Sequence, residues 1–200
     1  MPALSGCGGV RMSLTLTIPR LETGRLVLRG PQHDDFEPLC AFLLDRERSW
    51  GFGTERDRAK AWRWFACNIG HWALHGYGYF TIQWKETGQP CGITGIWNPE
   101  GWPEPEIGWV VFDGFEGRGI AFEGAERARR WAYEELGLAT LTSNIVPGND
   151  RSVALAERLG AWFEREYDNV EMGAERLYRH PSPADLGIGA DNDGSPEAYA

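Results

Sequence analysis

Residues 106–121 read EIGWVVFDGFEGRGIA, and this stretch decides the fold. The apolar run at 106–112 predicts a buried strand, and the glycines after it predict a tight turn into a helix. Such a turn leaves backbone N–H groups unpaired at the helix N-terminus, where the helix dipole is positive. Glycine also carries no side chain that would keep an anion at a distance. The stretch therefore predicts a cradle for a phosphate-bearing ligand.

Strands and helices alternate on both sides of this turn. Strands are predicted at 25–29, 77–84, 91–97, 140–146, 162–167 and 176–180, and helices at 34–44, 56–76, 121–136 and 151–159. The helix at 121–136 is the most clearly marked, because Ala121, Ala125, Ala128 and Ala132 form one apolar stripe. This order of elements predicts a mixed α/β sheet in one domain.

The length and the charge limit the domain organisation and the partners. We expect a disordered leader at 1–16, a single domain at 17–181 and a disordered acidic tail at 182–200. The tail holds four acidic residues and no Lys or Arg, so it accounts for −4 of the net charge of −9. The remaining −5 argues against unspecific nucleic-acid binding, which depends on Lys and Arg at phosphates.

The cysteines and the hydropathy pattern bear on the compartment. Cys7, Cys40, Cys67 and Cys91 are widely spaced and form no Cys-x-x-Cys motif, so neither a zinc site nor a disulfide framework is expected. No apolar run approaches the roughly 18–20 residues of a membrane span, and the N-terminus lacks the apolar core of a signal peptide. We therefore expect a cytoplasmic protein with no metal and no membrane partner.

The glycine turn by itself leaves several interpretations open. A dinucleotide-binding fold would place a third glycine where the chain has Phe122, and would end the next strand with an acidic residue where the chain has Asn144. A nucleoside-triphosphate loop would need Gly-Lys-Ser/Thr, which is absent. Two interpretations of the turn remain. It is either a cradle for a single pyrophosphate or a strand-to-helix connection without a ligand.

A second motif, Asn149-Asp150-Arg151-Ser152, opens the next helix. Together with the turn at 117–121, it resembles the GNAT superfamily of acetyl-coenzyme-A-dependent N-acetyltransferases. The resemblance spans roughly residues 18–180 and is greatest to the branch of the ribosomal-protein N-terminal acetyltransferases, whose first strand is similar to residues 21–29. It implies an N-acetyltransferase domain at 17–181. It also implies a central, mixed and mostly antiparallel sheet flanked by helices, with two strands splayed at the cofactor site.

The resemblance implies acetyl-coenzyme A as the co-substrate. The pantetheine arm would lie along the central strand, and the pyrophosphate would accept hydrogen bonds from the backbone of the turn. The residues so implied are Trp109, Val110, Val111, Phe112, Gly117, Arg118, Gly119, Ile120, Ala121, Asn149 and Ser152. For Arg118 a solvated turn position remains an alternative, and Asn149 also suits a helix cap. Glu116 departs from the family pattern and adds a negative charge beside the phosphate site.

Acetyl transfer to an amine needs a base for the amine proton and an acid for the leaving thiolate. By resemblance, Glu106 is the candidate base and Ser152 the candidate acid. The alternatives are that Glu106 only begins the strand and that Ser152 only stabilises the first helical turn. Many relatives use a tyrosine as the acid, but the corresponding positions here are Leu155 and Ala156. A backbone N–H near Val111 would stabilise charge on the acetyl oxygen.

An aromatic group near residues 71–79 is the candidate acceptor side. Trp72, Tyr77 and Tyr79, with His71 and His75, are interpreted either as an acceptor-pocket wall or as core and rim residues. The acceptor expected by resemblance is a primary amine, either a protein N-terminus or a small molecule, which attacks directly in a ternary complex.

Two other functions remain open. One is a non-catalytic acyl-coenzyme-A-binding or sensor domain of the same fold, and the other is a nucleotide-binding regulator. The sequence leaves both a monomer and a homodimer open.

Overall fold

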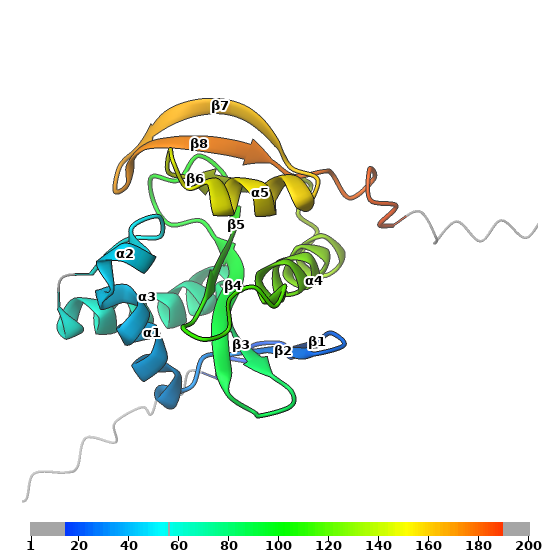
Figure 1. Cartoon of the computed structure of the whole chain (residues 1–200). Helices are drawn as coiled ribbons and strands as arrows, with labels where there is room; N and C mark the ends of the chain where they lie inside the picture. The colour runs from blue at the N-terminus through cyan, green and yellow to red at the C-terminus, as the bar shows by residue number, and fades with distance from the viewer. Residues whose placement is uncertain (1–14, 56, 190–200) are drawn as a thin grey trace, which may run out of the picture.

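One eight-stranded sheet forms the centre of the computed structural model, which describes residues 15–55 and 57–189 (Figure 1). Its strands are β1 Leu21–Glu22, β2 Leu26–Arg29, β3 Tyr79–Trp84, β4 Pro90–Trp97, β5 Glu106–Val111, β6 Thr142–Ile145, β7 Trp162–Asn169 and β8 Gly173–Arg179. They lie in the order β1-β2-β3-β4-β5-β6-β8-β7. All neighbours are antiparallel except β5 and β6. The predicted mixed, mostly antiparallel α/β fold is confirmed.

The helices lie on opposite sides of this sheet, as Figure 1 shows. They are α1 Phe36–Leu44, α2 Arg46–Ser49, α3 Arg58–His75, α4 Ile120–Glu134 and α5 Asp150–Arg158, with a 3-10 turn at His33–Asp35 before α1. Helix α2 was not predicted. Asp45 caps it by accepting hydrogen bonds from the backbone N–H groups of Glu47 and Arg48.

Helix α4 covers one face of the sheet through its small residues. Ala125, Ala128 and Ala132 are fully buried. At Gly124 an added Cβ would lie 3.2 Å from the side chains of Ile82 and Thr94, so the helix backbone runs close to β3 and β4. On the opposite face, a second apolar cluster joins α1 and α3 to β4 and β5. The sheet is therefore buried on both faces around β4 and β5.

Strands β5 and β6 separate soon after they meet. They are parallel and share one register pair, Glu106 with Thr142. One residue further along, the Ser143 hydroxyl donates to the carbonyl oxygen of Ile107 at 2.7 Å. This side-chain bond takes the place of a backbone pair, and beyond it the facing edges of β5 and β6 have no register partners in the described chain. The splayed strands expected from the resemblance are thus present.

The ordered chain extends beyond the predicted end of the domain at residue 181. Ser182–Asp185 forms a turn in which the Ser182 hydroxyl donates to the Asp185 carboxylate at 2.7 Å. Ile188 then packs against the main apolar cluster. Residues 1–14 of the leader predicted at 1–16, and residues 190–200 of the tail predicted at 182–200, lie outside the described residues. Within the described chain, no helix is long and apolar enough to cross a membrane.

The middle of β4 requires a residue without a side chain. An added Cβ at Gly95 would overlap the carbonyl oxygen of Gly78, whereas one at Gly24 would meet nothing within 4 Å. We expect Gly95→Ala to lower the free energy of unfolding by about 2 kcal/mol or more, because overpacking moves the backbone. Urea unfolding of Gly95→Ala, with Gly24→Ala as the matched control, tests this. Equal stability of the two variants would contradict it.

Candidate active site

Two cavities open at the gap between β5 and β6. We call the cavity beside the glycine turn the turn cavity, of about 620 Å³. The cavity beside Glu106 is the acid cavity, of about 520 Å³. Both have volumes typical of small-molecule sites. They share the lining residues Gly51, Phe52, Trp109, Asn149 and Ser152. Of these five, Trp109, Asn149 and Ser152 are residues that the resemblance assigned to the cofactor, and Gly51 and Phe52 are additional.

The backbone of β5 faces this gap on alternate residues. The Phe112 N–H donates to the Cys91 carbonyl oxygen at 2.9 Å, and the Gly108 carbonyl accepts from the Thr94 hydroxyl, so both point toward β4. By strand alternation, the backbone groups of Trp109 and Val111 point toward the open side. An elongated ligand with amide groups would find hydrogen-bond partners along this edge.

The glycine turn leaves the start of α4 open to an anion. Gly117 and Gly119 have φ angles of +73° and +76°, a conformation that glycine adopts without strain. Gly119 is the N-cap, and no side chain caps the first turn of α4. An added Cβ at Gly117 would meet nothing within 4 Å. The N–H groups at Ile120 and Ala121 thus line the turn cavity with the positive end of the helix dipole.

An arginine that sequence reasoning missed offsets the charge of Glu116. Arg48, from α2, forms ion pairs with Glu116 and Asp113. It also donates to the Val111 carbonyl oxygen at 3.4 Å. Arg158, from the last turn of α5, lies over the Phe122 ring at 4.2 Å and lines the same cavity. The negative charge that Glu116 adds is therefore paired inside the cavity.

Two residues predicted for cofactor binding are placed differently. Phe112 is buried in the α1–α3 core, and its N–H is already bonded to β4, so Phe112 lines neither cavity. The Arg118 guanidinium lies 5.6 Å from the Phe115 ring centroid rather than in a cavity. The Arg118 carbonyl oxygen instead accepts from Arg25 at 3.0 Å, which ties the turn to the start of β2.

Asn149 caps α5 at the point where the cavities meet. Its side-chain oxygen accepts from the Ser152 backbone N–H at 3.2 Å. Its amide nitrogen lies so close to Gly51 that an added Cβ there would overlap it. The predicted cap is confirmed, and Asn149 and Ser152 both line the junction. The Ser152 side chain makes no hydrogen bond within the described residues.

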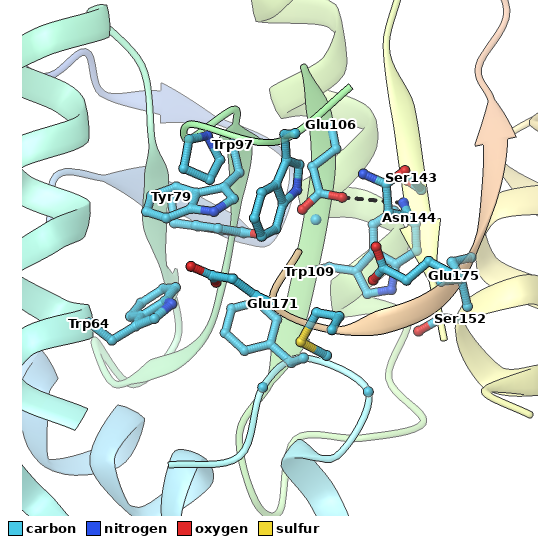
Figure 2. A pocket seen from close by; sticks show the side chains of 18 of the residues that line it. Trp64, Tyr79, Trp97, Glu106, Trp109, Ser143, Asn144, Ser152, Glu171 and Glu175 are labelled. Carbon is cyan, nitrogen blue, oxygen red and sulfur yellow. Dashed lines mark hydrogen bonds between the residues drawn. The ribbon is translucent and has the colours of Figure 1, made fainter. Parts of the chain in front are cut away.

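Glu106 lines the acid cavity, where its carboxyl group lies beside Asn144 (Figure 2). It is 9% exposed, and its carboxylate accepts from the Asn144 backbone N–H at 3.2 Å. Burial, and then the nearby Glu175 carboxylate, raise its pKa to about 8. The side-chain amide of Asn144 and the Trp102 indole nitrogen are buried without a hydrogen-bond partner in the described chain. The carboxyl group is thus surrounded by unpaired polar atoms, as at sites that take up a ligand or water.

Only one of the three predicted acceptor-wall residues lies at the acid cavity. Trp72 is 2% exposed, and its indole nitrogen donates to the Tyr79 carbonyl oxygen at 3.1 Å, so it is a core residue. Tyr77 packs against His71 and His75, outside both cavities. Tyr79 does line the acid cavity, and its hydroxyl lies where a side chain at position 108 would be. Gly108 therefore makes room for the Tyr79 ring over β5.

One face of α3 supplies wall residues that sequence reasoning missed. Lys60, Arg63, Trp64 and Cys67 line the acid cavity. Their spacing of i, i+3, i+4 and i+7 places them on one side of a helix, and this signal is present in the sequence. Glu175, from β8, is 4% exposed and also lines the cavity. Nothing in the sequence around Glu175 indicates this position, because β8 reaches the cavity only through the order of the sheet.

The raised pKa of Glu106 predicts how stability depends on pH. Between about pH 5 and pH 8 the folded chain holds a proton on Glu106 that the unfolded chain has lost, so this group destabilises the fold as pH rises. We expect Glu106→Gln to gain stability relative to the wild type from pH 5 to pH 9, by about 1.4 kcal/mol for each pKa unit of the shift at most. Thermal unfolding of both proteins at pH 5 and at pH 9 tests this.

Glu104→Gln is the control with the opposite sign. A hydrogen bond from Arg179 lowers the pKa of Glu104, so its removal should cost stability above pH 5. A stability difference between Glu106→Gln and the wild type that stays constant with pH would contradict the account.

Comparisons with known proteins agree with this geometry. An acetyltransferase from Agrobacterium tumefaciens superimposes with a TM-score of 0.76 and 36% identity, covering 86% of this chain and 99% of that one. RimL, an alpha-N-protein acetyltransferase of a ribosomal protein solved with coenzyme A, shares the fold (TM-score 0.66, 15% identity, 81% and 97% covered). The uncharacterised Bacillus subtilis protein YkkB is 25% identical over 149 residues, 73% of this chain and 87% of YkkB.

The acetyltransferase (GNAT) domain family matches residues 25–161, which include the glycine turn and the motif at Asn149. The match also takes in Glu106 and all five residues shared by the two cavities. With two thirds of its length matched, the chain belongs to the GNAT acetyltransferase family.

Proposed function

We propose that this enzyme transfers an acetyl group from acetyl-coenzyme A to a primary amine while both are bound. The turn cavity takes the coenzyme and the acid cavity takes the amine. The observation that carries the proposal is that the two cavities meet at Trp109, Asn149 and Ser152, with Glu106 lining the acid cavity. An amine there has a carboxyl group on one side and the open edge of β5 on the other.

The turn cavity fits the coenzyme by its donors and its shape. The open first turn of α4 at Gly119, Ile120 and Ala121 suits a pyrophosphate. The exposed backbone edge at Trp109 and Val111 suits the amide groups of a pantetheine arm. When bound there, acetyl-coenzyme A supplies the activated acetyl thioester.

Glu106 is the proposed base. A primary ammonium group has a pKa near 10 and must lose a proton before its nitrogen can attack a carbonyl carbon. A carboxylate with a pKa of about 8 is a better proton acceptor near neutral pH than an ordinary glutamate. As the bond from nitrogen to the acetyl carbon forms, Glu106 takes the amine proton, directly or through water.

Ser152 and the β5 backbone are proposed to act on the other side of the reaction. The bond from carbon to sulfur breaks as the amide forms, and the leaving sulfur needs a proton. Ser152, which lines both cavities, would donate it and regain a proton from water. The Val111 N–H, on the open edge of β5, would stabilise negative charge on the acetyl oxygen.

A non-catalytic sensor of the same fold is the second candidate. The absence of a tyrosine at Leu155 and Ala156 favours it. The charge of Glu116 does not, because Arg48 pairs with that carboxylate. The acceptor remains either a protein N-terminus, as for RimL, an alpha-N-protein acetyltransferase, or a small-molecule amine. The buried, high-pKa Glu106 supports the enzyme over the sensor.

A side chain at the glycine turn should block the coenzyme. We expect Gly119→Glu to raise the Kd for coenzyme A at least tenfold, because it adds a negative charge at the start of α4. Gly137→Glu is the matched control, because Gly137 also has a positive φ but lies beyond the opposite end of α4. Calorimetric titration measures both. Equal losses would mean that backbone strain, rather than the cradle, is responsible.

Removal of the base should stop turnover but not binding. We expect Glu106→Gln to lower kcat/KM at least 100-fold and to leave the Kd for coenzyme A unchanged. In the wild type, kcat/KM should rise with pH through an inflection near pH 8. In the variant that inflection should disappear, leaving only the slope from the acceptor amine. Full activity in Glu106→Gln would exclude this base.

If neither the wild type nor the variant turns over any amine while both bind acetyl-coenzyme A, the sensor candidate replaces the enzyme.

A further inference from the structure

The residues that line the acid cavity indicate which class of amine it binds. Its volume of about 520 Å³ lies in the range of small-molecule sites, and side chains of α3, β3, β4 and β8 line it besides the separated strands β5 and β6. Residues 171 and 172, from the turn between β7 and β8, line it together with the loop at 51–53. Figure 2 shows Glu171 extending from this turn toward Trp64.

Aromatic rings form one continuous wall of this cavity. Phe52, Trp64, Tyr79 and Trp97 all line it, and their ring centroids lie 5.3 to 5.8 Å apart in five neighbouring pairs. In Figure 2, Trp64, Tyr79 and Trp97 lie together on the side of the cavity away from Glu175 and Ser152. Such a wall favours a flat apolar group, which gains both apolar burial and stacking.

The position of the charges decides how many cationic groups the ligand carries. Two buried carboxyl groups, Glu106 and Glu175, line the cavity. Neither forms an ion pair with a basic side chain in the described chain. Burial raises the pKa of both groups, so near neutral pH the pair retains about one proton and carries one negative charge, which one ammonium group would compensate. The remaining charged lining residues are Glu55, Lys60, Arg63 and Glu171, two acidic and two basic. The outer part of the cavity therefore offers no net charge to a second cation.

We propose that the acceptor is a small arylalkyl amine, with one ammonium group at Glu106 and a flat aromatic group against Phe52 and Trp64. This inference rests on the proposed function for the reaction, but the binding of the amine is independent of turnover. A diamine would place its second charge among balanced side chains and aromatic rings. A peptide would place polar backbone groups against the same rings, which offer no hydrogen-bond acceptor for an amide N–H apart from the Tyr79 hydroxyl.

A panel of acceptors tests the class. The probes are 2-phenylethylamine, ethylamine, 1,3-diaminopropane and the dipeptide Ser-Ala, and the readout is release of free coenzyme A thiol. We expect kcat/KM for 2-phenylethylamine to exceed that for each of the others at least tenfold. A preference for the diamine or the dipeptide would overturn the proposal and leave the acetyl-transfer function standing.

Substitution of one wall residue locates the aromatic group. We expect Trp64→Ala to lower kcat/KM for 2-phenylethylamine at least tenfold more than it lowers kcat/KM for ethylamine. Trp64→Phe should restore most of the loss. Trp62→Ala is the matched control, because Trp62 lies on the same helix, is 43% exposed and packs on Phe36 outside the cavity. An equal loss with both amines would mean that Trp64 only supports the fold, and would overturn the assignment.

Binding without turnover separates this inference from the proposed function. The quenching of tryptophan fluorescence by 2-phenylethylamine is measured on the full chain without acetyl-coenzyme A. Saturable quenching that weakens in Trp64→Ala but not in Trp62→Ala, with no turnover of any amine, would sink the acetyl-transfer function and support the ligand class. The absence of both quenching and turnover with 2-phenylethylamine would overturn the ligand class.

Discussion

The separation of β5 from β6 is the constraint on which the site depends. It begins where the Ser143 hydroxyl donates to the Ile107 carbonyl oxygen. His180 holds Ser143 at 2.9 Å, and Arg129 lies 3.2 Å from the other His180 ring nitrogen. Burial and the Arg129 charge lower the His180 pKa to about 3, so its ring is neutral and accepts from Arg129. The opposite nitrogen then donates to Ser143, which fixes the direction of the whole chain of hydrogen bonds.

The gap between β5 and β6 positions functional groups of both cavities. It leaves the backbone edge at Trp109 and Val111 without a strand partner, which suits an extended coenzyme arm. It also places Glu106 at its closed end, where burial and Glu175 raise the carboxyl pKa. Arg48 closes the side of the turn cavity by pairing with Glu116 and Asp113. One local departure from strand pairing thus supplies the coenzyme edge, the base and the junction between them.

The features that could be predicted from the sequence are those that depend on local backbone conformation. The glycine turn at 117–121 and the cap at Asn149 could be found because positive φ angles and helix caps restrict the residue types allowed. It was harder to predict which side of each helix or strand faces the cavities. Helix α3 has apolar residues on more than one face, so the sequence does not show that Trp64 lines the cavity while Trp72 lies in the core. Phe112 belongs to the strand implied for the coenzyme, but strand alternation directs its backbone N–H toward β4. Arg48 and Glu175 reach the site through tertiary contacts that no local pattern contains.

The most direct test of the account is a crystal structure of the protein with coenzyme A. We expect the pyrophosphate on the backbone at Gly119–Ala121, the pantetheine arm beside Trp109 and Val111, and the sulfur where the two cavities meet near Ser152. Coenzyme bound elsewhere, or β6 closed against β5 with the arm outside the gap, would contradict the central claim that the separation of these strands creates the site.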